Sequence, residues 1–371
     1  MKLCVYNPVS LELLAVVTKA TSIIWEKKHY DVGNFELHLP RDAPYIETLT
    51  SGNIVVQGGN YGVIRYVSAP QERGANDVEI RGQTLQGICS DRTIVPPFFY
   101  MEGEIDPLYS YDRIKGTGEA VMKHYVTNHL TAPEDADRKI DNLIVAEDLG
   151  RGKTEVAWQA KFEKLSDVLK EIGQYAGLGW DITLDPVAKQ YQFDVIEGID
   201  RTVTQSDVAP VQFCREMKNV TSLSYENDGL SAINTVYAAG DGEEEQQYVT
   251  KLGGGTGISR REGTTSVSSD DVEEVRDLAT AYLEENSVKE SIEAVANDKT
   301  VYGQDWNLGD YVTVRVETPG EILMLNKQIT EVCETWERGI HTIEPVFGEK
   351  KDDIIKRMKR GKDNRGKRLI F

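Results

Sequence analysis

"SGNIVVQGGNYGVIRYVSAPQERGANDVEIRGQTL", from Ser51 to Leu85, reads as a series of short strands. Its apolar or alternating runs are rich in β-branched and aromatic residues, and Gly-Gly, Gly-Asn and Arg-Gly turn signals separate them. The residues before Ser51 have the same texture in the runs "LCVYNP", "LELLAVV", "SIIWEKKHY" and "NFELHLP". Residues 1–95 are therefore predicted to form a β-barrel domain, with a sandwich as the alternative.

A second stretch, from Leu308 to Gly348, repeats this order of strands and turns. Residue identity between the two stretches is low, so they indicate either two related β-domains or the generic texture of a β-meander. Further strands are predicted in "PVQFC", "VTSLSYEND" and "INTVYAAG", and a helix capped by Ser269 or Asp270 precedes the last four strands. Its apolar stripe is Val272, Val275, Leu278 and Tyr282. Residues 206–348 are thus predicted to form the second β-barrel domain.

Between these two regions, residues 96–205 read as a small inserted α+β domain. Residues 116–130 have a helical pattern, and "GWDITL" and "QYQFDVI" form a hairpin across Asp185-Pro186. A second helix ends at Gly177 and has the apolar face Phe162, Leu165, Leu169, Ile172 and Ala176. The predicted fold class is β-rich α+β, with two related β-barrel domains and one inserted α+β domain.

Composition excludes several classes of protein. The 371 residues carry a formal net charge of −19, which does not suit a surface that coats nucleic acid. Residues 349–371 reverse this sign with ten Lys/Arg against four Asp/Glu, so they are predicted to be a basic C-terminal tail that is either an interaction arm or a solvated end. The start lacks a secretory signal and no long apolar run exists, so a cytoplasmic product without membrane insertion is expected.

The glycine-rich stretch from Val249 to Gly263 suggests a phosphate cradle but does not fit one. Lys251 precedes the glycines, whereas a P-loop lysine follows them, and the spacing of the glycines also fails the dinucleotide fingerprint. With the acidic run "GDGEEE" before it, the stretch is predicted to be a long flexible loop between a strand and a helix. Such a loop either contacts a partner, lines an opening or serves as a linker.

Catalytic patterns are weak throughout the sequence. There is no G-x-S-x-G motif, the five histidines are scattered, and four well separated cysteines form no metal or disulfide pattern. His124 and His129 are five residues apart, which is off the metal-binding spacing of a helix. Asp181, Asp185 and Asp194 lie near aromatic residues on one predicted hairpin, but turn formation and packing also explain them. No catalytic residue, metal or cofactor is predicted.

Several ordered segments resemble a known family: "GLGWDI", "FDVIEGIDRTVTQ", "PVQFCREMKNVTSLSYENDGLSAINTVYAAGDGEE", "SRREG", "DDVEEVRDLATAYL" and "DWNLGDYVTVRVE". They are similar to segments of siphophage and prophage tail-hub proteins, the Tal-like or Gp37-like tail-associated proteins. The resemblance covers most of the chain and is clearest from Gly177 to Glu317. It implies a homotrimer whose two β-barrel domains per chain form a ring at the baseplate end of the tail tube.

The resemblance also implies a virion location and a set of partners. These are the distal tail or tail-tube protein, the tape-measure protein, and tip or receptor-binding proteins, while DNA only passes through the ring. An acidic body suits such a conduit, because like charges repel. Candidate partner contacts are Lys251, Gly253, Gly254, Gly255, Gly257, Arg260 and Arg261 in the glycine-rich stretch, and Lys356, Arg357, Lys359 and Arg360 in the tail.

Two other functions remain open from the residues alone. One is a carbohydrate-active or wall-degrading enzyme with an acidic cleft, for which Asp181 is the residue to test. The other is a monomeric carbohydrate-binding module that uses Trp25, Trp180 or Trp306. Many relatives continue into a wall-degrading or host-binding domain, whereas this sequence ends in a basic tail. We therefore expect a non-enzymatic structural protein, with tip activity supplied by another polypeptide.

Overall fold

The computed structural model describes residues 2–69, 77–100, 107–241, 248–266 and 271–348. These residues divide into two compact units. The first unit combines the chain up to Leu223 with Glu293–Phe347, and the second is formed by Ser224–Ile292. The predicted β-rich class with helices is confirmed. No helix among the described residues is both long and apolar enough to span a membrane.

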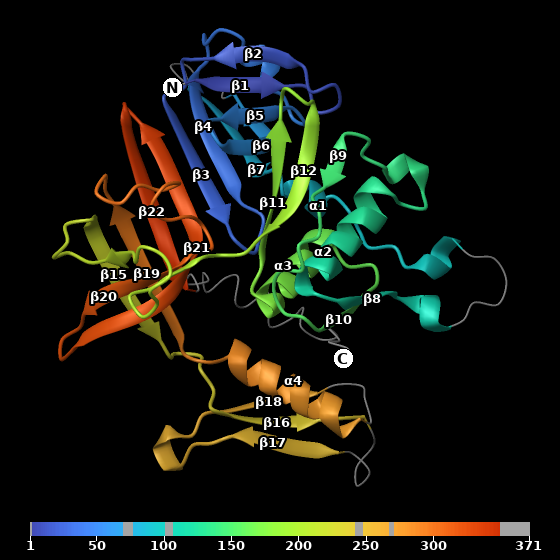
Figure 1. Ribbon diagram of the computed structural model, residues 1–371, viewed down its shortest axis with the longest axis vertical. Helices are drawn as coiled ribbons and strands as arrows, with labels where there is room; N and C mark the ends of the chain where they lie inside the picture. The colour runs from blue at the N-terminus through green and yellow to red at the C-terminus, as the bar shows by residue number, and fades with distance from the viewer. Residues whose placement is uncertain (1, 70–76, 101–106, 242–247, 267–270, 349–371) are drawn as a thin grey trace. The chain divides into compact units, whose positions relative to one another are not determined.

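The N-terminal strands form one antiparallel arrangement within the first unit (Figure 1). Every strand predicted before residue 95 is present: β1 (Leu3–Tyr6), β2 (Leu13–Val17), β3 (Ser22–Lys28), β4 (Asn34–Pro40), β5 (Ile54–Gln57), β6 (Asn60–Ser68) and β7 (Asp77–Thr84). Because side chains alternate along a strand, Ile54 and Val63 belong to one core and Val55 and Ile64 to another.

The C-terminal strands continue the same sheet, whose order is β15-β19-β22-β21-β3-β4-β7-β6-β5-β1-β2. The added strands are β13 (Asp200–Arg201), β14 (Gln212–Phe213), β15 (Val220–Asp228), β19 (Lys289–Ala296), β20 (Tyr311–Glu317), β21 (Ile322–Glu337) and β22 (Ile340–Gly348). The two halves meet where β21 pairs with β3, and β20 pairs with β13, β14 and β21 beside the main path. Among the described residues, no sheet closes into a barrel.

The two stretches of similar order adopt the same local topology. In residues 51–85, β5 pairs with β6 and β6 with β7, all antiparallel. In residues 308–348, β20 pairs with β21 and β21 with β22 in the same manner. Arg338 (φ 51°) and Gly339 (φ 82°) connect β21 to β22, as a two-residue hairpin turn with positive φ at both positions requires. Each stretch is therefore a three-stranded meander.

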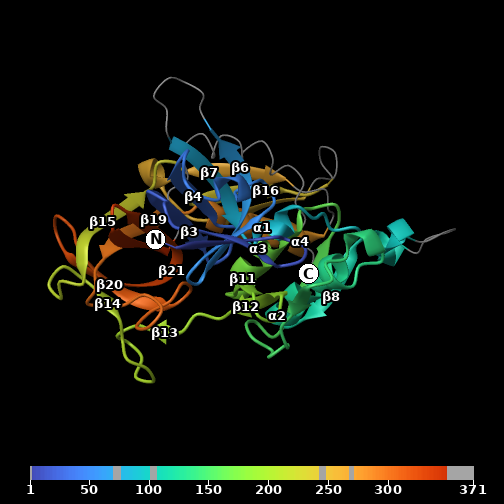
Figure 2. The same cartoon turned by 90° about the horizontal axis from the view of Figure 1, so that it is seen from above.

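Residues 96–205 contain the predicted helices and hairpin. Their elements are β8 (Asp112–Gly116), α2 (Gly118–Val126), β9 (Leu143–Val145), β10 (Val156–Ala160), α3 (Leu165–Ala176), β11 (Gly179–Asp185) and β12 (Gln190–Ile196). Thr117 caps α2 by accepting the backbone N–H of Ala120 at 3.1 Å, and Gly177 ends α3 with φ 74°. The helices α2 and α3 lie beside β11 and β12 and share one apolar core with them (Figures 1 and 2).

One predicted core position in this region is wrong. Phe162 precedes α3 instead of lying on its apolar face, has φ 58°, and is 53% exposed. The apolar spacing is sound from Leu165 onward, but the chain before it forms a turn.

The remaining helical segments are short. They are α1 (Gly87–Ser90), 3-10 helices at Ile46–Thr48, Pro97–Tyr100, Pro107–Ser110, Ala136–Arg138 and Gly257–Ser259, and a π-helical turn at Thr127–Thr131.

The second unit contains a small sheet with one helix on its face (Figure 1). Its strands are β16 (Thr235–Ala239), β17 (Val249–Gly253) and β18 (Glu262–Ser266), in the order β17-β16-β18. The helix is α4 (Val272–Glu285), which packs Val275 and Ala279 on Val236 and Ala238. Its cap is Asp271, which accepts the N–H of Glu273 at 2.8 Å, so the expected cap at Ser269 or Asp270, outside the described residues, is wrong.

Candidate functional site

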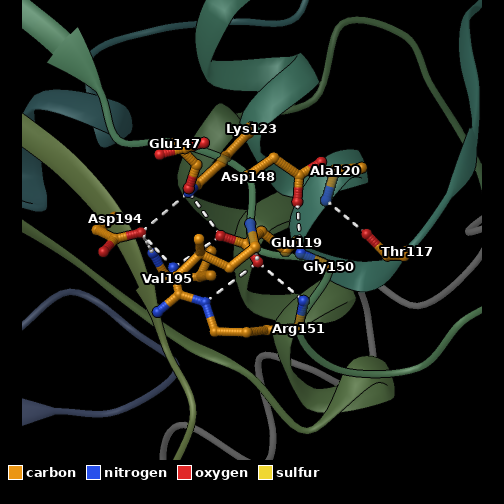
Figure 3. Close-up of polar contacts among 11 residues, drawn as sticks. Thr117, Glu119, Ala120, Lys123, Glu147, Asp148, Gly150, Arg151, Asp194 and Val195 are labelled. Carbon is orange, nitrogen blue, oxygen red and sulfur yellow. Dashed lines mark hydrogen bonds and ion pairs between the residues drawn. The ribbon is translucent and has the colours of Figure 1, made fainter.

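A buried carboxylate at the start of α2 collects a complete shell of donors (Figure 3). Glu119 Oε1 accepts from Arg151 Nη2 at 2.7 Å and from Lys123 Nζ at 2.6 Å. Its Oε2 accepts from Arg151 Nε at 3.1 Å and from the backbone N–H groups of Arg151 at 2.8 Å and Leu149 at 3.1 Å. Both cations also contact Asp194 Oδ1, at 2.6 Å from Arg151 and 3.1 Å from Lys123. The cluster fastens α2, the segment at Leu149 and β12 to one another.

The charges in this cluster are balanced. Burial alone would raise the pKa of Glu119, but the hydrogen bonds from Arg151 and Lys123 outweigh it and hold the pKa at about 2. An ionised carboxylate whose two oxygens both accept from charged donors is not available as a general acid. The arrangement therefore holds the inserted region together. Sequence reasoning missed it, because only the Glu119–Lys123 spacing of four residues was visible locally.

A second buried cluster places two histidines on one carboxylate. His124 Nε2 lies 2.7 Å from Asp112 Oδ1, and His129 Nε2 lies 2.9 Å from Asp112 Oδ2. Burial would raise the pKa of Asp112, but these two hydrogen bonds bring it to about 2. The five-residue spacing works because α2 passes into a π-helical turn, in which the N–H of Ala132 bonds to the C=O of Thr127. Local sequence does not show that widening.

The predicted partner contacts of the glycine-rich stretch are ordered, which corrects the expected flexible loop. Lys251 and Gly253 belong to β17, which pairs with β16. Gly253 adopts φ 85°, and a Cβ there would lie 2.2 Å from the carbonyl oxygen of Asn234. The N–H of Gly254 bonds to that same oxygen at 2.8 Å. Residues 254–261 then lead to the other side of β16, where β18 begins, so the glycines lie at the end of β17 and in the connection between the two outer strands of one sheet. Of the acidic run, residues 242–245 lie outside the described residues.

The remaining contacts of this stretch lie in and after the turn. Gly257 has φ 53° and begins a 3-10 turn. Arg260 pairs with Glu262 and donates to the hydroxyl of Tyr237 at 2.8 Å. Arg261 donates its backbone N–H to Asn234 Oδ1 at 3.0 Å, and its guanidinium bonds to the carbonyl of Gly229. The tail residues Lys356, Arg357, Lys359 and Arg360 lie outside the described residues.

Arg261 lines an open groove of about 930 Å³ in the second unit. Apolar side chains in its wall are unusually accessible: Leu230 is 94% exposed and Ile258 is fully exposed. Glu226 and Asp228 add negative charge to the same groove. The structure thus brings one predicted contact residue, Arg261, together with two exposed apolar side chains.

The carbohydrate-binding alternative is not supported by the three tryptophans. Trp25, Trp180 and Trp306 are all fully buried, and each indole N–H bonds inside the protein. They fill cores and offer no stacking platform to a sugar.

The three candidate acids of the hairpin lie in different environments. The hairpin register places Asp181 opposite Asp194, but Asp194 binds Arg151 while Asp181 accepts the N–H of Ile182. Burial raises the pKa of Asp181 to about 6. Asp185 accepts the two turn N–H groups that follow it, as predicted for a turn residue.

Comparison with known proteins identifies relatives of the whole chain. The family model described as siphovirus ReqiPepy6 Gp37-like protein matches residues 2–349. The tail protein from Neisseria meningitidis MC58 is 16% identical with a TM-score of 0.57, over 94% of this chain and 97% of that chain. The 43 kDa tail protein of prophage MuSo2 from Shewanella oneidensis is 11% identical with a TM-score of 0.57, over 94% and 98%. No curated relative matches. The TM-scores show a shared fold with these two tail proteins.

Proposed function

Because the chain belongs to the siphovirus Gp37-like family, we propose that it is a structural component of a phage tail and acts as its hub. In this role it forms a homotrimeric ring that closes the distal end of the tail tube and joins the tube to the baseplate or tip. The observation that carries the proposal is the match over residues 2–349, together with the shared fold of two tail proteins over nearly their whole lengths. The chain acts by assembly and not by catalysis.

Two related β-domains in one chain would let a trimer match the sixfold symmetry of a tail tube. The meanders of residues 51–85 and 308–348 have the same strand order and support related domains at residues 1–95 and 206–348. Three copies would present six similar domains around an axis, so a threefold hub could sit on a sixfold tube. In the assembled ring each related domain would form one barrel-like sector, and residues 96–205 would decorate the ring.

The partners follow from that position. A hub contacts the distal tail or tail-tube protein on one side, the tip or receptor-binding proteins on the other, and the tape-measure protein at its centre, while DNA passes through. The groove that contains Arg261 and Ile258 is the proposed partner face on the second unit. Residues 349–371, with ten Lys/Arg, are a proposed dock for an acidic partner.

Light scattering coupled to size exclusion, over a range of concentrations, tests the assembly. We expect a mass of about three times 41.5 kDa, and particles with a central hole in electron micrographs. A monomer at every concentration, both alone and with the distal tail protein added, would contradict the hub role.

A binding assay tests the partner face separately. Ile258→Asp should reduce capture of the tip or distal tail protein, because Ile258 is fully exposed in the groove. Val187→Asp is the matched control, since Val187 is 94% exposed on the β11–β12 hairpin of the first unit. Equal capture by both variants would argue against the groove as the contact.

A further inference from the structure

One edge of β21 is open along its first half. The second half, Ile329–Glu337, pairs with β22, and from Glu331 onward also with β3. Among the described residues, which end at Gly348, the first half (Ile322–Gln328) pairs with β20 alone. Within the described part of the chain, residues Ile322–Leu325 therefore have one edge whose backbone N–H and C=O groups meet no strand. Such an edge is a template for adding a strand from another chain.

The side chains on this edge favour protein contact. The sequence Ile322-Leu323-Met324-Leu325 contains no charge and no proline, the two devices that commonly protect an exposed edge from pairing. Ile322 is 57% exposed and Met324 is 49% exposed. Successive strand residues face opposite sides, so these two side chains lie on the same face and would pack beside the side chains of a strand that pairs with this edge.

A second open edge lies at the other end of the same sheet. β2 is the last strand of the pairing order, and β1 is its only strand partner among the described residues. Its sequence, "LLAVV", is also uncharged and without proline. Leu13 is 52% exposed and Leu14 is 43% exposed. Each chain thus carries two different apolar edges, one in each half of its large sheet and both within the first compact unit.

We propose that these edges pair head to tail, β2 of one copy with the first half of β21 of the next, and that three such contacts close the ring. This inference rests on the proposed hub function. The occupant of each edge is a second copy of this chain, because the same sheet supplies both an acceptor and a complementary strand of similar length and polarity. Contacts between unlike surfaces generate a ring when the rotation between copies closes and an open filament when it does not, whereas pairing of two identical edges ends at a dimer.

Two charge substitutions and their mixture test the pairing. Leu14→Asp damages only the β2 edge, and Met324→Asp damages only the β21 edge. In a head-to-tail ring either variant breaks every contact, so each alone should have the monomer mass of 41.5 kDa where the unmodified chain is trimeric. The mixture retains one intact contact, between β21 of the Leu14→Asp chain and β2 of the Met324→Asp chain, and should give twice that mass.

Controls separate this inference from the hub role and from misfolding. Val187→Asp should stay trimeric, and circular dichroism should show all three variants folded; an unfolded variant is replaced by Leu13→Asp or Ile322→Asp at the same edge. Trimeric single variants, a dimeric Leu14→Asp, or a mixture that stays monomeric would each overturn the head-to-tail pairing and leave the hub function standing. An unmodified chain that is monomeric at every concentration, both alone and with the distal tail protein added, would overturn both.

Discussion

The Glu119 cluster makes a sharp prediction about an isosteric substitution. Glu119→Gln preserves the shape of the side chain but replaces one acceptor oxygen by an NH₂ group, which only donates. Within the described residues, the hydrogen-bond partners of Glu119 are all donors: Arg151, Lys123 and two backbone N–H groups. In either orientation the new amide therefore faces two or three donors that it cannot satisfy.

The size of the effect follows from these lost bonds. Hydrogen bonds to charged groups contribute about 1.5–3 kcal/mol each, and breaking one partner of a buried ion pair costs about 3–5 kcal/mol. Glu119 is fully buried, and Arg151 and Lys123 keep Asp194 as their second anion. We expect the free energy of unfolding of the first unit to fall by about 3–5 kcal/mol at pH 7.

Urea denaturation followed by far-ultraviolet circular dichroism measures this loss. The control is Glu155→Gln at an exposed position, whose free energy of unfolding should stay within about 0.5 kcal/mol of that of the unmodified chain. The folded pKa of Glu119 is depressed from 4.5 to about 2, so its contribution is complete above pH 4.5 and is lost as the pH falls through 2. The difference between the unmodified chain and Glu119→Gln should shrink over that window. A loss below about 1 kcal/mol at pH 7, or a difference that does not change with pH, would refute the reasoning.

Two further predictions concern His29, which is fully buried and has neither ring nitrogen hydrogen-bonded within the described residues. Gly309 has φ 96°, and a Cβ added there would lie 2.4 Å from the His29 ring. Gly309→Ala should therefore lower the free energy of unfolding by about 3 kcal/mol, measured by thermal or urea unfolding. The control is Gly320→Ala, which should change little because a Cβ there would meet open space. Burial lowers the pKa of His29 from 6.5 to about 4, so between these pH values the unfolded chain binds a proton that the folded chain does not. The free energy of unfolding should therefore fall as the pH drops from 6.5 to 4. A His29→Gln variant with the same pH profile as the unmodified chain would contradict this.

Local sequence predicted most of the strands because alternation and turn residues are local properties. The hairpin at Arg338-Gly339 and the glycine stop at Gly177 were both visible as short signals. The error at Phe162 arose because an apolar residue one turn before a helix fits the helical period whether or not the backbone is helical there. The error in the glycine-rich stretch has another cause. The strand β18 forms by pairing with β16, whose residues are far away in sequence, so a local pattern shows only a loop.

The candidate clusters depended on contacts that no local pattern contains. Glu119 meets Arg151 and Asp194 only after α2, the segment before β10 and β12 have packed together. His124 and His129 share a carboxylate only because a π-helical turn changes the helical period between them.

The sequence by itself determined the β-rich class, the position of the helices, the repeated order of strands and turns, and the resemblance to tail-hub proteins, because each depends on residue type and short spacing. Tertiary structure decided which side chains are available. It buried Trp25, Trp180 and Trp306 and paired the inserted carboxylates with cations. Among the described residues, it also left one edge of β2 and one edge of the first half of β21 without a paired strand. Burial and edge exposure result from how distant segments pack, so only the folded chain shows which residues can contact another protein.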